Sequence, residues 1–173
     1  MLEFDVDAMA TCPDQFPRLA VKRAQSPEIA RLFEDLARRA EVFAKMLDEF
    51  TESVGRHRSA REGRPVRLSR RQQQMLSEFD RDAEKAVQEM ERHIARLDDA
   101  TLLSSALSGV DQQIRLDERM FTGWHEDDKP MAARLLDFER ETKAIIQRFV
   151  ESSPFKGKVR SLWNAKQTTK RAG

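Results

Sequence analysis

The residue types that most often carry catalysis or bind metals are sparse in this chain of 173 residues. None of the three histidines, His57, His93 and His125, follows a glutamate three positions earlier, as the ligand motif of a di-iron helical bundle requires. The single cysteine, Cys12, excludes a zinc site built from several cysteines of one chain. Zinc-protease, P-loop, dinucleotide-binding and serine-hydrolase motifs are also absent. We therefore predict no catalytic residue, no metal site and no cofactor.

One short cluster contains side chains of the kind that bind a divalent cation. His125 is followed directly by Glu126, Asp127 and Asp128. The same aspartates precede a predicted helix, and acidic residues stabilise the N-terminus of a helix by capping it and by interacting with its dipole. We take the role at the helix N-terminus as the prediction and the cation site as the alternative.

Arginines are concentrated in residues 56–71, where Glu62 is the one acidic residue. They are Arg56, Arg58, Arg61, Arg64, Arg67, Arg70 and Arg71. Guanidinium groups bind phosphates and carboxylates through paired hydrogen bonds, so this segment, predicted as a loop, is a candidate anion-binding or nucleic-acid-binding site. The alternative is a solvated loop whose arginines pair with acidic helices nearby. No aromatic residue in the segment offers a surface on which a base can stack.

Residues 154–173 combine basic residues with an apolar stripe and contain no acidic residue. Lys156, Lys158 and Arg160 are further candidates for binding an anion or a nucleic acid. The apolar residues that share one face of a helix are Phe155, Val159, Leu162 and Trp163. Such a segment can bind a groove of a partner, an anionic membrane or a nucleic acid. Two alternatives stay open: the stripe packs back on the rest of the chain, or the segment is disordered.

Long windows without proline or glycine predict the helices that position these residues. The first window follows Ser26 as the N-cap and Pro27 as the first helical residue, and it ends at Gly55. Its apolar residues recur at alternating spacings of four and three: Leu36, Ala40, Phe43, Leu47, Phe50 and Val54. The charged share of 35%, against roughly 25% in typical domains, also suits long amphipathic helices.

Three more helices are predicted further along the chain. The second begins at Ser69, and either Asp98 or Asp99 can cap a new helix within its window. A short helix spans residues 110–121. The last helix begins just before Pro130, and its seam consists of Met131, Leu135, Phe138, Thr142, Ile145 and Phe149.

These patterns predict an all-α fold, a helical bundle of about four main helices with coiled-coil-like heptad seams. Residues 1–25 form an N-terminal extension, residues 26–153 the bundle domain and residues 154–173 a basic C-terminal tail. The lone cysteine, the lack of a signal peptide and the lack of an apolar run of roughly 20 residues predict a cytoplasmic protein.

The predicted function is protein interaction without catalysis, as an adaptor, a chaperone-like protein or a regulatory subunit. The partner is expected to bind helix faces and the tail, with Trp124 and the four apolar tail residues as its contacts. A homodimer is compatible with the long, regular seams. The alternative is a nucleic-acid-binding protein that uses residues 56–71 and the basic tail.

Overall fold

The computed structural model describes residues 15–63, 85 and 87–171. The described residues form helices and no strand, which confirms the predicted all-α class. The helices are α2 (Gln15–Arg23), α3 (Pro27–Glu62), α5 (Asp99–Phe121), α6 (Lys129–Ser152) and α7 (Lys156–Arg171). Residues 87–94 are also helical and belong to the second predicted helix, whose start at Ser69 lies outside the described residues.

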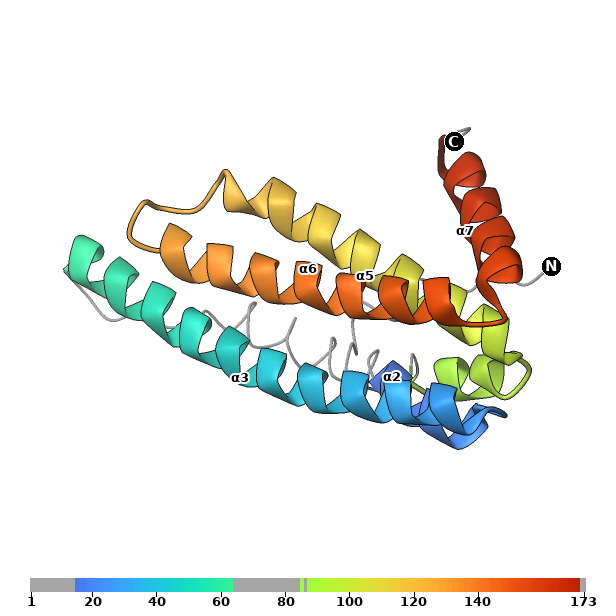
Figure 1. Cartoon of the computed structure of the whole chain (residues 1–173). Coiled ribbons are helices and arrows are strands. Elements are labelled where there is room, and N and C mark those ends of the chain that lie inside the picture. The colour runs from blue at the N-terminus through green and yellow to red at the C-terminus, as the bar shows by residue number, and fades with distance from the viewer. Residues whose placement is uncertain (1–14, 64–84, 86, 172–173) are drawn as a thin grey trace.

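The long helix α3 runs along the whole molecule, and α5 and α6 form an antiparallel hairpin beside it (Figure 1). Helix α6 packs against both α5 and α3, whereas α3 and α5 make little contact with each other. The short helix α2 folds back on α3, and α7 packs mainly on α5 at the end where α3 begins. Among the described helices, α2 and α6 are therefore the ones that pack substantially against α3.

The apolar core is divided into two clusters along the bundle. The larger brings together α2, α3, α5, α6 and α7. Its most deeply buried large side chains are Phe16, Ile29, Phe33, Met90, Leu102, Leu103, Ile146 and Val159. The smaller cluster contains Phe50 of α3 and Leu135 of α6, and Trp124 packs against it. Both clusters join α3 to α6, so they fix the relative position of the two helices at two separated points.

Residues 1–25, predicted as an N-terminal extension, contain helix α2, which is part of the core. Phe16 is 2% exposed, and its ring meets that of Phe33 edge to face at a centroid distance of 6.0 Å. Pro17 lies in the first turn of α2, where a backbone N–H has no partner within the helix, so the proline does not disturb it. Helix α2 contains Pro17, so a search for windows without proline or glycine does not find it.

Helix α3 begins where the sequence predicts and ends later. Ser26 is the N-cap residue and Pro27 the first helical residue. The predicted end at Gly55 is wrong, because the helix continues to Glu62 and stops at Gly63, whose φ of 64° is left-handed. A glycine inside a helix costs only about 1 kcal/mol, which the favourable neighbouring residues outweigh.

The first part of the predicted loop 56–71 is consequently helical, which corrects that prediction. Two of its arginines pair with glutamates one turn away along α3. Arg56 lies 3.6 Å from Glu52, and Arg58 lies 2.7 Å from Glu62. Pairs at this spacing stabilise a helix, so the arginines extend α3 and do not interrupt it.

The adjacent residues Asp98 and Asp99 have separate roles at the start of α5. The side chain of Asp98 accepts a hydrogen bond from the backbone N–H of Thr101 at 2.9 Å, which confirms the alternative of a capped new helix. The buried carboxylate of Asp99 accepts the backbone N–H groups of Gln25 at 2.8 Å and Ser26 at 2.9 Å. Asp99 thus supplies, from another helix, acceptors at the start of α3, where the Ser26 side chain makes no cap hydrogen bond.

Helix α5 is one continuous helix, so the prediction of a separate short helix over residues 110–121 is wrong. Gly109 lies inside it at the boundary between the two predicted pieces. A glycine at this position lowers helix stability by about 1 kcal/mol. This is less than the free energy gained by burying Leu102, Leu103 and Ile114 on either side of it.

Candidate functional site

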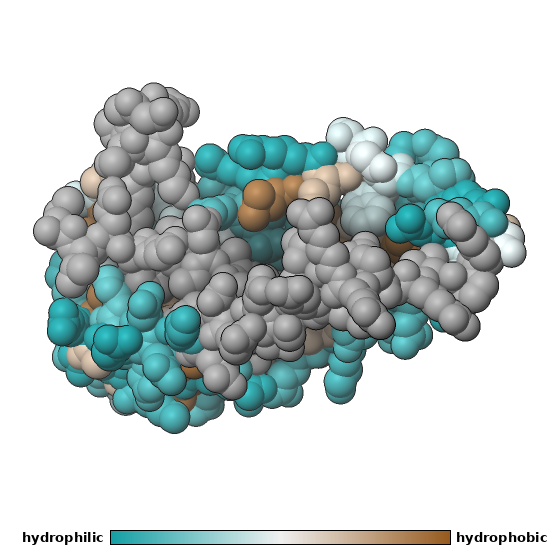
Figure 2. All heavy atoms as spheres, turned by 180° about the vertical axis from the view of Figure 1, so that it is seen from behind, coloured by the Kyte–Doolittle hydropathy of each residue, from teal (hydrophilic) through white to brown (hydrophobic). Residues whose placement is uncertain are grey.

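A groove lies between α3 and α5 and contains a cavity of about 400 Å³. Its lining comes from α2, α3, α5 and α6 and is mostly apolar, with Phe16, Leu36, Phe43, Leu47, Val110 and Ile146 among the lining residues. Figure 2 shows a small patch of apolar atoms beside hydrophilic ones on one face of the molecule. This volume is within the range of pockets that hold organic ligands or several side chains of a partner.

Exposed apolar side chains extend the groove along both of its sides. Leu47 on α3 is 44% exposed although it continues the heptad pattern of the buried Leu36. On α5, Leu116 is 38% and Met120 53% exposed, and both follow the lining residue Gln113 at helical spacing. Apolar surface of this kind on facing helices indicates a binding surface.

One wall of the groove is built from aromatic rings and a guanidinium group. Phe43 of α3 and Phe138 of α6 stack with centroids 6.0 Å apart, and Arg39 lies 4.2 Å above the Phe138 ring. The Arg39 guanidinium donates hydrogen bonds to Thr142 Oγ1 at 2.9 Å and to the Phe138 carbonyl oxygen at 3.1 Å, and it lies 3.4 Å from Glu141. Arg39 is therefore held in place by several partners, and the wall is rigid.

The buried carboxyl group of Glu139 is the most unusual polar group of the groove. Glu139 lines the cavity, is 7% exposed and belongs to α6. Burial and the neighbouring Asp117 of α5 raise the pKa of Glu139 to about 9, so its carboxyl group is protonated at neutral pH. The Glu139 Oε2 atom is buried and has no hydrogen-bond partner. Buried polar atoms without a partner are rare in folded proteins.

The hydrogen-bond directions around Glu139 follow from these facts. Asp117 accepts a hydrogen bond from the Gln113 side-chain amide at 3.0 Å, and the protonated Glu139 donates to the Asp117 carboxylate. The two acids together carry one negative charge.

Sequence reasoning missed Glu139, although a signal was present. Leu135, Glu139, Thr142 and Ile146 recur at spacings of four, three and four, so they share one face of α6. Leu135 and Ile146 are buried, which makes Glu139 an acid within an apolar stripe. A charged residue in such a position is seldom buried unless it is paired or protonated.

The arginines that were predicted to bind anions lie at the end of α3 or outside the described residues. Arg56 and Arg58 pair within α3, and Arg61 lies 3.5 Å from Asp127. The remaining four, Arg64, Arg67, Arg70 and Arg71, are outside the described residues. The three described arginines thus contact acids of their own chain, two of them within α3 and Arg61 an acid that precedes α6.

The tail forms helix α7, and its apolar stripe packs on the core. Val159 is 1% exposed, and Phe155, Leu162 and Trp163 are partly buried against the larger cluster.

The basic tail residues bind acids of the bundle: Lys156 and Arg160 each lie 2.6 Å from Glu151, and Lys158 binds Asp98. Lys158 and the cap hydrogen bonds from Thr101 lower the pKa of Asp98 to about 2, and Lys156 and Arg160 lower that of Glu151. This is the arrangement in which the tail docks on its own bundle.

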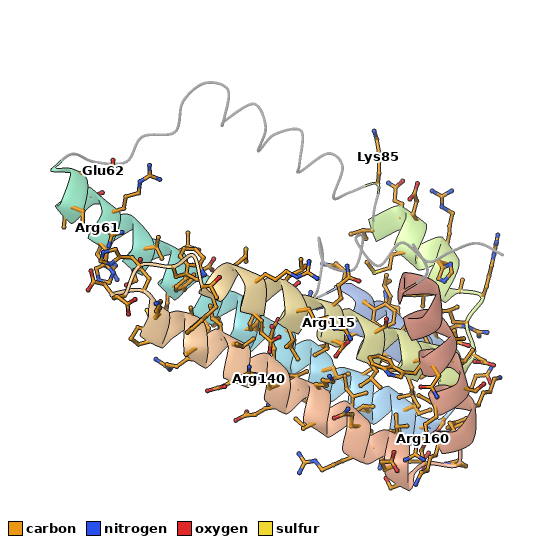
Figure 3. All side chains as sticks on the ribbon, turned by 90° about the horizontal axis from the view of Figure 1, so that it is seen from above. Arg61, Glu62, Lys85, Arg115, Arg140 and Arg160 are labelled. Carbon is orange, nitrogen blue, oxygen red and sulfur yellow. The ribbon has the colours of Figure 1, made fainter. Side chains whose placement is uncertain are left out.

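The described residues of the two basic segments do not share a surface. Arg61 lies at the far end of α3, and Arg160 lies on α7 at the opposite end of the molecule (Figure 3). Phosphate contacts along one nucleic-acid strand or duplex require basic groups on a continuous face. Within the described residues, the two groups would have to bind separate sites.

Trp124 and the acidic cluster before α6 close one end of the bundle. The Trp124 ring meets that of Phe50 edge to face at 4.8 Å, so this predicted partner contact is partly buried against the smaller cluster. Asp128 is the N-cap residue of α6, but its side chain makes no cap hydrogen bond. It accepts one from His57 Nδ1 of α3 at 2.6 Å. Among the described residues, no group of His, Cys, Asp and Glu is arranged to hold a metal ion.

Replacing Asp128 with alanine is expected to lower the free energy of unfolding by about 2 kcal/mol, because hydrogen bonds to charged groups contribute roughly that much. The Asp128 side chain is 1% exposed and joins the end of α3 to the start of α6. Asp127, 56% exposed, is the matched control, and its replacement by alanine should change stability by less than about 0.5 kcal/mol. Urea unfolding measures both; equal effects would show that the His57 contact contributes nothing.

Comparisons with known proteins identify no relative. No protein-family model, no curated protein and no solved structure matches the chain. None of the described helices has the length and apolar composition that a membrane-crossing helix needs. The groove and its acid pair are therefore the features from which a function is inferred.

Proposed function

We propose that this protein is a non-enzymatic interaction module that binds an amphipathic helix of a partner protein in the groove between α3 and α5. The observation that supports it is the apolar lining of the groove together with the exposed apolar side chains on its two sides, Leu47 on α3 and Leu116 on α5. An amphipathic helix binds such a surface with apolar side chains spaced three or four residues apart.

The packing of the helices gives the groove the shape that suits a helix. Both α3 and α5 pack on α6 but make little contact with each other, so a helix placed between them touches both. Helix α2 already lies on α3 at one end, and its Phe16 and Pro17 form the end of the groove. The proposed partner helix occupies the space beyond Pro17.

The tail is not the surface proposed here, because its apolar stripe packs on the core. Nucleic-acid binding receives no comparable support from the described residues. Lys156, Lys158 and Arg160 pair with acids of the bundle, and they lie at the other end of the molecule from Arg61. In a homodimer, a second copy of the chain is an alternative occupant of the groove. The crosslinking experiment below distinguishes this second copy from a partner protein.

A photo-crosslinking amino acid, p-benzoylphenylalanine, at position 47 of the full chain tests the proposal in cells. Crosslinks from position 47 to an amphipathic helix of another protein are the expected result. Position 144 is the control, because Ala144 is exposed on α6 and points away from the lining residue Thr142. A crosslink to a second copy would replace the partner with a homodimer, and an intramolecular crosslink would show that the chain fills its own groove.

The crosslinked segment, made as a synthetic peptide, then provides a quantitative test. Leu47→Glu is expected to weaken its binding at least tenfold, because a carboxylate would be placed against apolar side chains. Ala144→Glu adds the same charge outside the groove and should leave the dissociation constant unchanged. Isothermal titration calorimetry measures both. Equal affinity of the two variants would place the peptide elsewhere on the molecule and would remove the proposal.

A further inference from the structure

We infer that one exposed, basic side of helix α7 binds the surface of an anionic lipid bilayer. This contact is separate from the groove, so it goes beyond the proposed function. Figure 1 shows α7 at one end of the molecule, at a steep angle to α5 and α6, with its C-terminal part extending away from the bundle. A flat surface that approaches this end therefore meets α7 before it meets the middle of the bundle.

Positive charge is concentrated in α7 and is not balanced within it. Residues 154–173 contain no acidic residue, and their basic residues are Lys156, Lys158, Arg160, Lys166, Lys170 and Arg171. The whole chain has a net charge of +1, so these positive charges are set against an excess of acids elsewhere in the chain. Each basic residue close to an anionic membrane surface strengthens binding about fivefold, so several together produce measurable adsorption.

The basic side of α7 is defined by Lys156, Arg160 and Trp163, which follow one another at spacings of four and three residues. Lys170 and Arg171 come seven and eight residues after Trp163, and the helical repeat returns these positions to the same side. The Lys156 side chain is 43% exposed and that of Arg160 is 59% exposed. Lipid headgroups can therefore reach both without any movement of α7.

One acid of the bundle holds both of these exposed groups. Glu151 of α6 lies 2.6 Å from Lys156 and 2.6 Å from Arg160, and its own side chain is 46% exposed. Exposed ion pairs contribute little to stability, so exchanging this carboxylate for several lipid headgroups costs little. Lys158 lies on the other side of α7, where it binds Asp98.

The arrangement favours a lipid surface over a nucleic acid. Trp163 is partly buried against the larger cluster, so its ring lies at the boundary between the core and the solvent. Tryptophan is enriched at the level of the headgroups where proteins meet a membrane. A long polyanion needs basic groups along a continuous face, whereas Arg61 and Arg160 lie at opposite ends of the molecule (Figure 3). A bilayer needs basic groups at one end alone.

The contact is electrostatic, because the apolar stripe of α7 is packed on the core. Val159 is 1% exposed, so it does not insert among acyl chains while α7 is docked. Salt screens the attraction between exposed charges, with a Debye length of about 10 Å at an ionic strength of 0.1 M. Binding should therefore weaken as the salt concentration rises, whereas insertion of apolar side chains would resist salt.

Sedimentation of the full chain with lipid vesicles tests the inference. The vesicles contain phosphatidylcholine alone or phosphatidylcholine with about 30% phosphatidylserine. We expect binding to the anionic vesicles that falls at least tenfold between low and moderate salt, and no binding to phosphatidylcholine alone. Equal binding to the two kinds of vesicle, or no binding to either, would overturn the inference. Binding that salt does not change would overturn the electrostatic contact.

Two pairs of substitutions locate the contact on the molecule. Lys156→Gln together with Arg160→Gln removes two positive charges from α7 and should weaken binding to the anionic vesicles at least tenfold. Arg58→Gln together with Arg61→Gln removes the same charge at the far end of α3, and this matched control should leave binding nearly unchanged. Equal weakening by the two pairs would assign binding to the overall charge and would overturn the inference.

Glu151→Gln tests the same contact in the opposite direction. It removes the acid that holds Lys156 and Arg160, so binding to the anionic vesicles should tighten severalfold. Glu141→Gln removes the same charge elsewhere on α6, where the side chain is 71% exposed, and should have a smaller effect. Equal effects of the two substitutions would contradict a contact through α7.

Two further measurements separate this inference from its alternatives. A single-stranded oligonucleotide that binds more tightly than the anionic vesicles at the same salt concentration would replace the lipid with a nucleic acid. Leu47→Glu changes the groove, and vesicle binding should be retained in this variant. Vesicle binding that is lost in Leu47→Glu would place the lipid contact at the groove and would overturn the role of α7.

Discussion

Replacing Glu139 with glutamine is expected to stabilise the protein at pH 8 by about 3 kcal/mol. Glutamine has the shape of a protonated glutamic acid, and its amide N–H can donate to Asp117 as the acid does. It carries no charge at any pH, so the unfolded glutamine variant gains no stability by releasing a proton, whereas the unfolded wild type does so at Glu139, which is 7% exposed in the folded protein. A substitution in the lining of the proposed binding groove is then expected to increase stability, as is common where function conflicts with packing.

The pH dependence follows from the direction of the shift. The folded-state pKa of Glu139 is about 9, above its ordinary value of 4.5. Below pH 4.5 both states hold the proton, and the contribution to stability is fully present. Between the two pKa values the unfolded chain releases a proton that the folded protein keeps, so stability falls by up to about 1.4 kcal/mol per pH unit. The loss is complete once the pH exceeds the folded pKa.

Urea unfolding of the wild type and of Glu139→Gln at several pH values between 5 and 8 measures this difference. The free energies of unfolding of the two proteins should approach each other at pH 5 and diverge as the pH rises. Glu141→Gln is the control, since the Glu141 side chain is 71% exposed, and its pH profile should match that of the wild type. Parallel profiles for wild type and Glu139→Gln would contradict the prediction and would mean that Glu139 is ionised in the folded state.

The sequence was sufficient to predict where several helices begin, because local chemistry determines a helix start. Ser26 and Pro27 mark the start of α3, and Asp128 marks that of α6. The ends were predicted less well. Gly55 and Gly109 were treated as breaks, but a single glycine costs too little to end a helix whose neighbouring residues favour it.

The candidate site was not predicted, because it depends on which helices meet. Phe43, Leu47 and Phe138 were assigned to helix seams, and a seam shows only that a face is apolar. Leu47 is 44% exposed because the described helices do not cover it. Which apolar face stays uncovered depends on how the helices pack, and the sequence pattern of one helix does not contain that information. The acid pair has the same origin, since Asp117 and Glu139 lie on different helices. The basic segments were easier to see in the sequence, but the structure pairs their described residues with acids.

Replacing Val159 with aspartate is expected to detach α7 from the bundle and to lower the free energy of unfolding by about 3 kcal/mol, as for other unpaired buried charges. Val159 is 1% exposed within the larger apolar cluster, so the new carboxylate would lose its water without gaining a partner. The surface ion pairs of Lys156 and Arg160 with Glu151 cannot hold the helix alone, because exposed pairs contribute little.

Ser161→Asp adds the same charge on the exposed side of α7 and is the matched control. Amide hydrogen exchange should accelerate across residues 156–165 in Val159→Asp and stay slow in Ser161→Asp, because α7 keeps its protection only while its apolar stripe is packed. Equally slow exchange in the two variants would contradict the prediction. Equally fast exchange, in the wild type as well, would mean that the tail is already free in solution. The apolar stripe with Trp163 would then be available to a partner, and the tail would become a second binding surface beside the groove.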